Sequence, residues 1–536
     1  MIMWRTFFAV ALCGIAFGQA TPPQSHRVSG TVVNSATGEP VRKALVTLPA
    51  SDGQHTAFTD ASGQFQLDNI PDGQYQIQCQ KPGFFGPNER MINRWNPAEQ
   101  ITVSATATPV TLKLAPAASI QGRVVDQDGE PVEGMTLRLF ATTLVEGRKR
   151  LTTNGWTPTD EDGAYEFGNL APGSYQLQMG MRRAFEFGAP TAQSSIRPEA
   201  YPERFYPDSP DAASAQPILP GPGQTARADF TAKLVPAFRI QGTVSPVGQG
   251  TGIGLETPDG DNAGFFIRAN PRTGRWTIPA VPNGMWIVTA STNGPNGGYY
   301  SEQSVSVNGS DIANVSLQLQ PGVSIPLHVI NAAESGPTPM LTLVQDPPAV
   351  TAKLGRDEYY PNRLHDGAPD ANAGNNPEQG FMNVRPGHYR LVARGFPSAC
   401  IGSITSGGTD LEREGLTVSP GAAVAPIEIT LGTNCGTIAI NVNGSGAASV
   451  LIIPERPLLQ PIMIQAGGRA IQISNLPPGN YRVYAFDDAS GLEYANPEVM
   501  RSFSSKEVSL DANQSAQVTL DIVKLKSEGS TESASR

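Results

Sequence analysis

The residues best suited to contact a ligand are aromatic side chains that follow a repeated turn-and-strand motif. Planar aromatic faces stack on sugar rings, and nearby arginines hold the hydroxyls. Alternatively, the same rings cap the open edges of β-sandwiches or pack between neighbouring units. The candidate ligand-binding residues are Phe84, Phe85, Trp95, Tyr201, Arg204, Phe205, Tyr206, Tyr299 and Tyr300.

Residue patterns for catalysis are missing from the sequence. None of the five histidines has Glu three positions later, as the H-x-x-E pair of a zinc peptidase requires. The G-x-S-x-G elbow, the P-loop and the dinucleotide-binding fingerprint are also absent. Asp487 and Asp488 are adjacent, so on a strand they point to opposite faces and cannot flank one glycosidic bond. We therefore expect a protein that is not an enzyme and has no metal or other cofactor.

Cysteine spacing leaves a disulfide as an open expectation. Cys79 lies in a strand-like alternating segment, where a small buried apolar side chain is expected. Cys400 and Cys435 lie near the two ends of one repeat unit, so these two are the candidates for a disulfide. The chain has no C-x-x-C spacing, which argues against a structural zinc site.

The first twenty residues have the pattern of a secretory signal peptide. Arg5 precedes a short apolar stretch, and Gly18 and Ala20 supply the small residues that cleavage after Ala20 requires. A lipid anchor on Cys13 is disfavoured, because the bulky Leu12 precedes it. We expect a monomeric exported chain, secreted, periplasmic or on the outer cell surface, without a transmembrane segment.

Charge and composition narrow the class of protein further. Lys and Arg total 38 against 48 Asp and Glu, a net charge of −10. Such a chain lacks the basic character of nucleic-acid-binding proteins. Charged residues make up only 16% of the chain, which is too few for coiled coils.

A short motif occurs five times at intervals of about 90 to 110 residues: a small or turn-forming pair that ends in glycine, then any residue, then an aromatic that opens an alternating strand. Each copy opens a segment in which apolar and polar residues alternate, as in a half-buried strand. We expect the aromatic residues to pack at the strand entry as a tyrosine corner does. These structural aromatics are Tyr75, Tyr175, Trp286, Tyr389 and Tyr481.

Two further motifs accompany it. Asp60 and Asp160 each begin an Asp-x-x-Gly turn, but the twelfth position from Asp160 is Ala171, so a hairpin Asx-turn is favoured over a calcium loop. Strands that open the units contain Gly30 and Gly122, which predicts a bulge or a close backbone approach. Short strands between turn signals predict an all-β chain of sandwiches in series.

The order of these motifs resembles the carboxypeptidase regulatory-like domain. The resemblance is close in the first two units, which carry Gly38-Glu39-Pro40 and Gly129-Glu130-Pro131 between their opening strands, and moderate in the third. The last two units resemble secreted acidobacterial proteins built of this domain, at 404–410 and 481–488. The resemblance implies seven-stranded Greek-key sandwiches of the prealbumin-like or carbohydrate-binding-like fold.

The expected organisation is a leader, five sandwiches and a disordered polar tail. The expected ranges are 1–20 for the leader, 27–116, 117–235, 236–321, 322–433 and 434–524 for the sandwiches, and 525–536 for the tail. We expect an exported non-catalytic protein that binds carbohydrate or mediates adhesion, with glycans or an envelope protein as partners and no nucleic acid. The alternatives are a structural spacer or assembly partner in the envelope, and an accessory to a peptidase.

Overall fold

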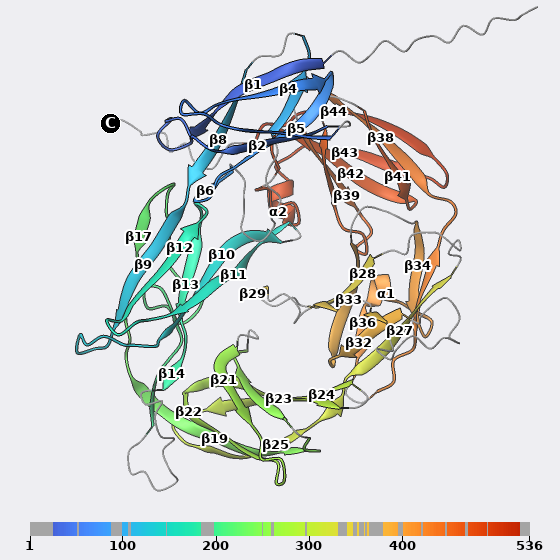
Figure 1. Ribbon diagram of the computed structural model, residues 1–536. Coiled ribbons are helices and arrows are strands. Elements are labelled where there is room, and N and C mark those ends of the chain that lie inside the picture. The colour runs from blue at the N-terminus through green and yellow to red at the C-terminus, as the bar shows by residue number, and fades with distance from the viewer. Residues whose placement is uncertain are drawn as a thin grey trace, which may run out of the picture. The chain divides into compact units, whose positions relative to one another are not determined.

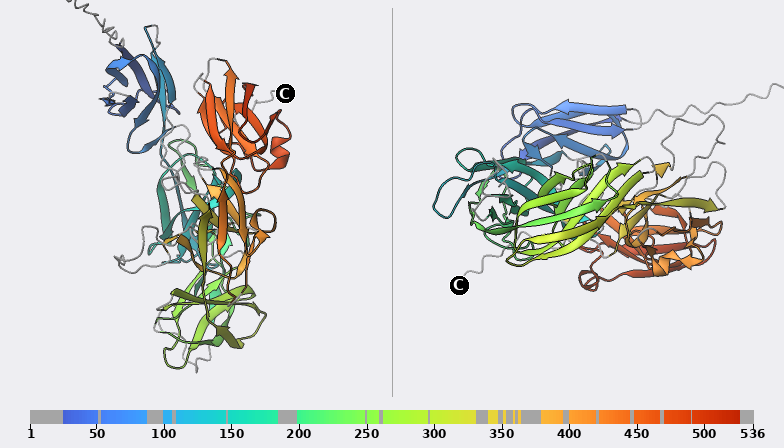
Figure 2. Two further views of the ribbon diagram at one scale, coloured as in Figure 1. Left: turned by 90° about the vertical axis from the view of Figure 1, so that its right-hand side faces the viewer. Right: turned by 90° about the horizontal axis from the view of Figure 1, so that it is seen from below.

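The expected all-β fold is confirmed in a computed structural model, drawn in Figure 1 and from two further directions in Figure 2. The expected leader, Trp95 and all but the first residue of the expected tail lie outside the residues that it describes. The described residues are 25–50, 53–86, 99–105, 109–145, 147–183, 198–248, 250–258, 262–294, 297–330, 340–346, 351–352, 358–359, 362–363, 379–394, 400–419, 422–444, 448–466, 470–489 and 491–525.

The chain divides into two compact units, one of residues 1–82 and 96–114, the other of residues 83–95 and 115–536. The first sandwich has the sheets β4-β1-β8 and β3-β2-β5-β7, and β6 (Phe84–Phe85) pairs with Ala115 and Pro116 at the end of β8. Its strands are β1 (Ser25–Asn34), β2 (Leu45–Ala50), β3 (Gly53–Phe58), β4 (Gln64–Pro71), β5 (Gly73–Gln80), β7 (Glu99–Val103) and β8 (Val110–Pro116).

The second sandwich faces a sheet β12-β9-β17 with a sheet β16-β13-β10-β11, and β18 also pairs with β9. Its buried core includes Ile120, Leu137 and Leu177 from both sheets. The strands are β9 (Ala118–Val125), β10 (Thr136–Val145), β11 (Arg148–Pro158), β12 (Ala164–Leu170), β13 (Tyr175–Met179), β16 (Arg204–Phe205), β17 (Thr225–Arg227) and β18 (Phe230–Thr231).

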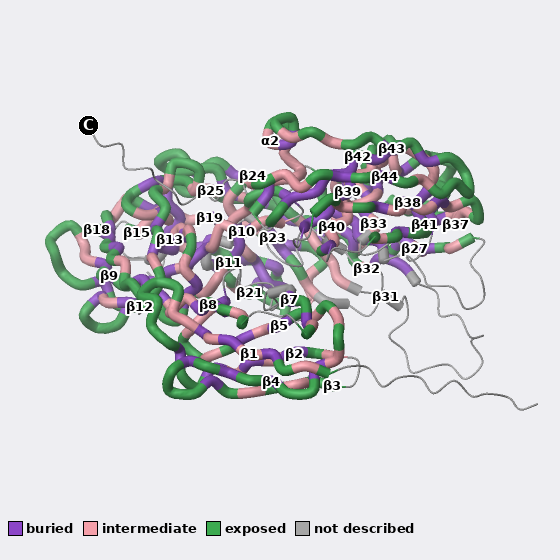
Figure 3. The backbone as a smooth tube through the Cα atoms, turned by 90° about the horizontal axis from the view of Figure 1, so that it is seen from above, coloured by how far each residue is buried: buried purple, intermediate pink, exposed green. Residues whose placement is uncertain are grey.

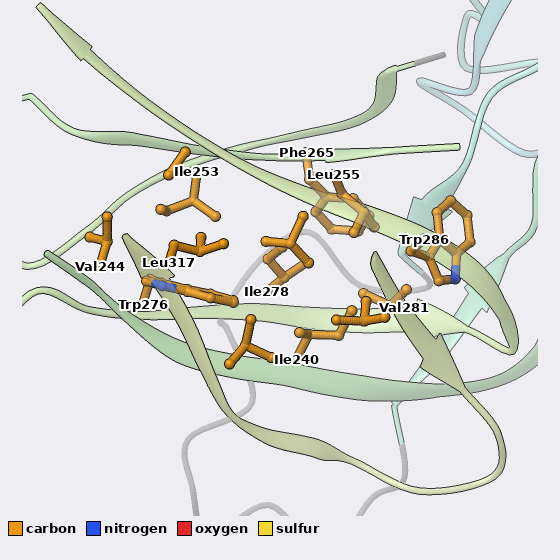
Figure 4. Packing of buried hydrophobic residues seen from close by; sticks show 14 of the residues in the cluster. Ile240, Val244, Ile253, Leu255, Phe265, Trp276, Ile278, Val281, Trp286 and Leu317 are labelled. Atoms are coloured by element: carbon orange, nitrogen blue, oxygen red, sulfur yellow. The ribbon is translucent and has the colours of Figure 1, made fainter. Parts of the chain in front are cut away.

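The third sandwich has one sheet of order β14-β15-β19-β22, with β25 also on β19, and a second of order β21-β20-β23-β24-β26. Trp276, Ile278 and Leu317 pack between the sheets (Figure 4). The strands are β14 (Arg182–Arg183), β15 (Glu199–Tyr201), β19 (Val235–Ser245), β20 (Gly252–Glu256), β21 (Asn262–Arg268), β22 (Arg275–Pro282), β23 (Gly284–Gly294), β24 (Gly297–Val307), β25 (Ile312–Gln318) and β26 (Gln320–Pro321).

The fourth sandwich combines the sheets β31-β32-β27-β37-β34-β35 and β30-β28-β33-β36. The two-residue strand β29 (Thr351–Ala352) pairs instead with β11. The other elements are β27 (Val323–Ile330), β28 (Met340–Gln345), β30 (Glu358–Tyr359), β31 (Asn362–Arg363), β32 (Gln379–Val384), β33 (Gly387–Arg394), β34 (Ile401–Ser406), β35 (Thr409–Asp410), α1 (Leu411–Glu414), β36 (Leu416–Val418) and β37 (Ile427–Leu431).

The fifth sandwich combines the sheets β41-β38-β44 and β40-β39-β42-β43. Neither α1 nor α2, the helices of the described chain, is long or apolar enough to cross a membrane. The elements are β38 (Gly436–Asn443), β39 (Ala448–Pro454), β40 (Ile462–Ala466), β41 (Ile471–Leu476), β42 (Gly479–Phe486), α2 (Pro497–Met500), β43 (Lys506–Leu510) and β44 (Ser515–Asp521).

All five sandwiches place their first strand parallel to a late strand of the same repeat. The pairs are β1 with β8, β9 with β17 and β18, β19 with β25, β27 with β37, and β38 with β44. Buried and exposed residues alternate along many strands, as Figure 3 shows by colour and β4 illustrates with buried Phe65 and Leu67 between exposed neighbours. One face of each such strand therefore packs on the core, as the period-2 patterns predicted.

At the glycine of the opening strands, the backbone of a later segment comes close, as the sequence predicted. A Cβ on Gly122 would collide with the carbonyl oxygen of Ala228 and meet the Tyr165 hydroxyl at 2.7 Å. Gly30 has the same relation to the carbonyl of Val110 and the ring of Phe65, whose nearest atom would lie 2.7 Å away. The parallel pairing of first and last strand therefore requires a residue without a side chain at this position.

Candidate functional site

The aromatic segment 201–206 lies against the second sandwich, with one ring buried and the other two half-buried. Phe205 is buried, and its ring centroid lies 6.0 Å from that of Phe140. Tyr206 packs edge-to-face on Phe230, with centroids 5.8 Å apart. Arg204 forms an ion pair with Asp208 at 3.5 Å. The expected exposed platform is not found in this segment, because its rings complete the packing of the sandwich.

The other predicted aromatics that the structure describes are half-buried. Phe84 and Phe85 are half-buried in β6, and Tyr299 packs against the core of the third sandwich, as Tyr201 does in the second. Tyr300 donates a hydrogen bond to Oε2 of Glu302 at 2.6 Å, and the guanidinium of Arg385 lies 4.2 Å from its ring centroid. Burial, reinforced by Glu302, raises the pKa of Tyr300, so its hydroxyl stays protonated.

The repeated Gly-x-aromatic motif forms a corner at the entry of the strand. The side chain donates a hydrogen bond to the backbone carbonyl four residues earlier: Tyr175 to Ala171 at 2.6 Å, and Trp286 to Pro282 at 3.0 Å. Tyr389 and Tyr481 bond to Arg385 and Pro477 in the same way. Tyr75 occupies the corresponding position in β5 and is half-buried. These aromatics therefore brace the sandwiches.

The Asp-x-x-Gly turns bind their own backbone. Oδ1 of Asp160 accepts hydrogen bonds from the amides of Asp162 at 3.0 Å and Ala164 at 2.7 Å. Asp60 forms the same pair of contacts in the first sandwich. This is an Asx-turn, and its carboxylate is occupied by amide donors. Among the described residues, no group of three or more His, Cys, Asp or Glu side chains could hold a metal ion.

An exposed tryptophan that the sequence analysis did not select lies on β11. Trp156 has 70% of its surface exposed. It lies directly opposite Arg138 on β10, which in turn lies opposite Gln178 on β13. Directly opposed residues of neighbouring strands share a face, and the neighbours Leu137 and Leu139 point into the core. Trp156, Arg138 and Gln178 therefore form a row on the outer face of this sheet, here called the Trp156 face.

Amide groups beside this row have unused hydrogen-bonding capacity. Gln178 is fully buried and donates from Nε2 to Oε1 of Glu203, while its Oε1 has no partner among the described residues. Oε1 of Gln176 and Nδ2 of Asn154, a residue beside a register shift in β11, are likewise unpaired within the described chain. Buried polar atoms are nearly always hydrogen-bonded, so these atoms mark incompletely satisfied packing beside the row.

The third sandwich carries an aromatic at the same position of the repeat. Trp156 stands four residues before the Asx-turn residue Asp160, and Phe266 stands four before Asn270, which accepts from Arg272 and Thr273 in the same kind of turn. Phe266 is 68% exposed. A Cβ on Gly252 would meet its ring at 2.5 Å, so the ring lies over β20 at Gly252. The offset from the turn is the sequence signal that could have identified both residues.

A polar depression of about 490 Å³ opens on the other sheet of the second sandwich. Gln121, Arg123, Glu166 and Arg227 line it, together with the backbone of the Asx-turn region. Arg227 is held by Asp229 at 2.7 Å. The lining has positively and negatively charged side chains, which can donate and accept hydrogen bonds, but no exposed aromatic ring.

Two stretches match the family model of the carboxypeptidase regulatory-like domain, residues 27–114 and 119–199. The first and second sandwiches are therefore carboxypeptidase regulatory-like domains. A protein of Myxococcus xanthus, the TonB-dependent transporter Oar, is 31% identical over 137 residues. That alignment covers 25% of this chain and only 12% of the transporter.

Solved structures that align with parts of this chain include two bacterial pilins and a protein of Bacillus anthracis. The Streptococcal ancillary pilin is 10% identical, with 55% of this chain and 100% of the pilin aligned and a TM-score of 0.18. The minor pilin GBS52 of Streptococcus agalactiae is 15% identical, with 40% and 97% aligned and a TM-score of 0.22. The Bacillus anthracis TIE protein is 14% identical, with 55% and 51% aligned and a TM-score of 0.18.

Proposed function

We propose that this chain is an exported, non-catalytic carbohydrate-binding protein of the cell envelope, and that the Trp156 face binds sugar. The observation that carries the proposal is the exposed indole of Trp156 directly opposite Arg138 on the neighbouring strand. A single exposed apolar residue is ordinary on a protein surface. Here the indole stands directly opposite a cationic side chain on the neighbouring strand.

The chemistry of that row suits a sugar. An indole face stacks on the apolar face of a pyranose ring, while guanidinium and amide groups bond to its hydroxyls. Because the surface is flat and holds one stacking ring, the expected affinity is micromolar to millimolar, or about 4–8 kcal/mol.

A place in the cell envelope is supported by two observations. The first twenty residues have the pattern of a cleavable leader. One matched relative is named as a TonB-dependent transporter. Cell fractionation and N-terminal sequencing of the mature protein test this part, and a chain that starts at Met1 and stays in the cytoplasm would contradict it.

Glycan-array screening of the mature chain, repeated with Trp156→Ala, tests the sugar-binding face. Loss of the stacking ring is expected to weaken binding at least about tenfold, or 1.4 kcal/mol. Phe58→Ala is the matched control, because Phe58 is 69% exposed in the first sandwich but stands only two residues before its Asx-turn. Absence of binding to any glycan, or equal binding by wild type and Trp156→Ala, would overturn the proposal.

A second candidate function, a structural spacer in the envelope, is favoured by one feature. The 455–459 loop of the fifth sandwich inserts into the fourth, where Leu458 is buried in the core and its carbonyl accepts from the Ala393 amide at 2.9 Å. A spacer needs such fixed junctions, whereas a sugar-binding module does not. A chain that binds no glycan but has a stiff fourth–fifth junction in small-angle scattering would favour the spacer.

A further inference from the structure

Two thiols lie against the same backbone residue between the fourth and fifth sandwiches. The carbonyl of Cys400, just before β34, accepts a hydrogen bond from the Gly432 amide at 2.8 Å. The thiol of Cys435, just before β38, points to the Gly432 carbonyl at 3.6 Å. A Cβ built on Gly432 would lie 3.4 Å from the Cys400 sulfur. The two side chains therefore meet at Gly432, although 35 positions separate them in the sequence.

The backbone beside Cys400 is held independently of the sulfur atoms. Arg456 of the fifth sandwich donates to the Ile401 carbonyl at 2.9 Å. It also makes a two-pronged contact with Glu412, at 3.0 Å from Nε and 2.7 Å from Nη2. Charge-assisted pairs of this kind fix geometry as well as adding energy. The backbone next to Cys400 is therefore held in place by contacts that do not involve either sulfur.

We propose that Cys400 and Cys435 form a disulfide in the exported protein, and that this bond ties the start of β34 to the segment that enters β38. The structure contains no disulfide between Cys400 and Cys435. An oxidising compartment outside the cytoplasm is where such a pair is oxidised and stays oxidised. The inference does not depend on sugar binding, so the two proposals fail separately.

The oxidation proceeds by thiol–disulfide exchange with a small or protein disulfide, for example oxidised glutathione. Cys435 is half-buried and Cys400 is buried, so the Cys435 thiolate attacks first and releases one thiol of the oxidant. The Cys400 thiolate then attacks the Cys435 sulfur and releases the second. The two thiol protons end on the two released thiols, and two electrons reduce the oxidant. Burial raises the pKa of Cys400 to about 12, which agrees with its reacting second.

Peptide mapping of the mature, exported chain tests the bond. The chain is denatured, alkylated without reductant and digested with trypsin. Arg413 separates the two cysteines, so the disulfide links peptide 395–413 to peptide 414–469. We expect this linked pair, and alkylation of Cys79 alone. Alkylation of both Cys400 and Cys435 without reductant, or a link from either to Cys79, would overturn the proposal.

Stability measurements give a second test with matched variants. Reductant is expected to lower the urea midpoint of wild type and of Cys79→Ser. It should have no effect on the double variant Cys400→Ser/Cys435→Ser, which cannot form the bond. If reductant lowers the midpoint of the double variant as much as that of wild type, the effect is not due to this disulfide. Should the double variant fail to fold, the peptide map of wild type still decides.

Discussion

The hydroxyl of Tyr389 donates a hydrogen bond to the backbone carbonyl of Arg385, four residues earlier in the chain, at 2.9 Å. The ring folds back over the intervening glycine, since a Cβ on Gly387 would lie 3.4 Å from it. One side chain thus packs in the core and closes the turn that leads into its own strand. Because the corner recurs in successive sandwiches, it is part of what makes the repeats fold alike.

Removing this hydrogen bond should destabilise the fourth sandwich. Tyr389→Phe keeps the ring and loses the bond, so we expect the free energy of unfolding to fall by about 1 kcal/mol. Tyr389→Ala also leaves a cavity and should cost roughly 3–5 kcal/mol. Urea unfolding followed by circular dichroism measures both. A Phe variant as stable as wild type would mean that the ring alone forms the corner.

The close contact of Gly122 with the carbonyl of Ala228 makes a second test. Gly122→Ala would force β9 and the segment after β17 apart, and should cost about 3 kcal/mol or prevent folding of the second sandwich. Gly168→Ala is the control within the same sandwich, because its Cβ would have an ordinary contact at 3.8 Å. Comparison of the two variants by thermal unfolding checks the expectation, which equal melting temperatures would contradict.

The repeat pattern predicted much of this fold but little of its surface. The spacing of Tyr75, Tyr175, Trp286, Tyr389 and Tyr481 predicted the number of sandwiches, because each corner depends only on a turn and the next strand. The Asx-turn at Asp160 could be predicted for the same reason, since its hydrogen bonds are local.

Segment 201–206 could not be placed from local pattern. Its aromatics look like a binding platform in sequence, but Phe140 of β10 is buried beneath Phe205. Which segment covers an apolar outer residue depends on the path of the chain after the strand, and strand alternation does not encode that path. Trp156 was missed because its one sequence signal, the offset of four residues from the Asx-turn at Asp160, becomes visible only when Phe266 is found exposed at the same offset from Asn270.

Alkaline pH should destabilise the second sandwich through Tyr175. Burial raises its pKa from the ordinary 10.0 to about 12. The folded state therefore keeps the proton while the unfolded chain loses it. The stabilisation that comes from keeping Tyr175 protonated is complete below pH 10. It is lost as the pH rises to 12, which lowers the free energy of unfolding by roughly 2 kcal/mol. Urea midpoints at about pH 9 and about pH 11.5 should differ more for wild type than for Tyr175→Phe, and an equal difference would contradict this assignment.

Phe266 offers a test of whether the third sandwich binds the same ligand as the second. Its ring lies over β20 at Gly252, in the repeat position of Trp156, and Tyr300 and Glu302 lie on the same sheet. If both faces bind, immobilised polysaccharide should retain wild type more strongly than either Trp156→Ala or Phe266→Ala, because two linked weak sites gain avidity. In Phe266→Ala, the affinity for a monosaccharide in solution should fall far less than the retention on immobilised polysaccharide. Retention of Phe266→Ala equal to wild type would restrict binding to the second sandwich.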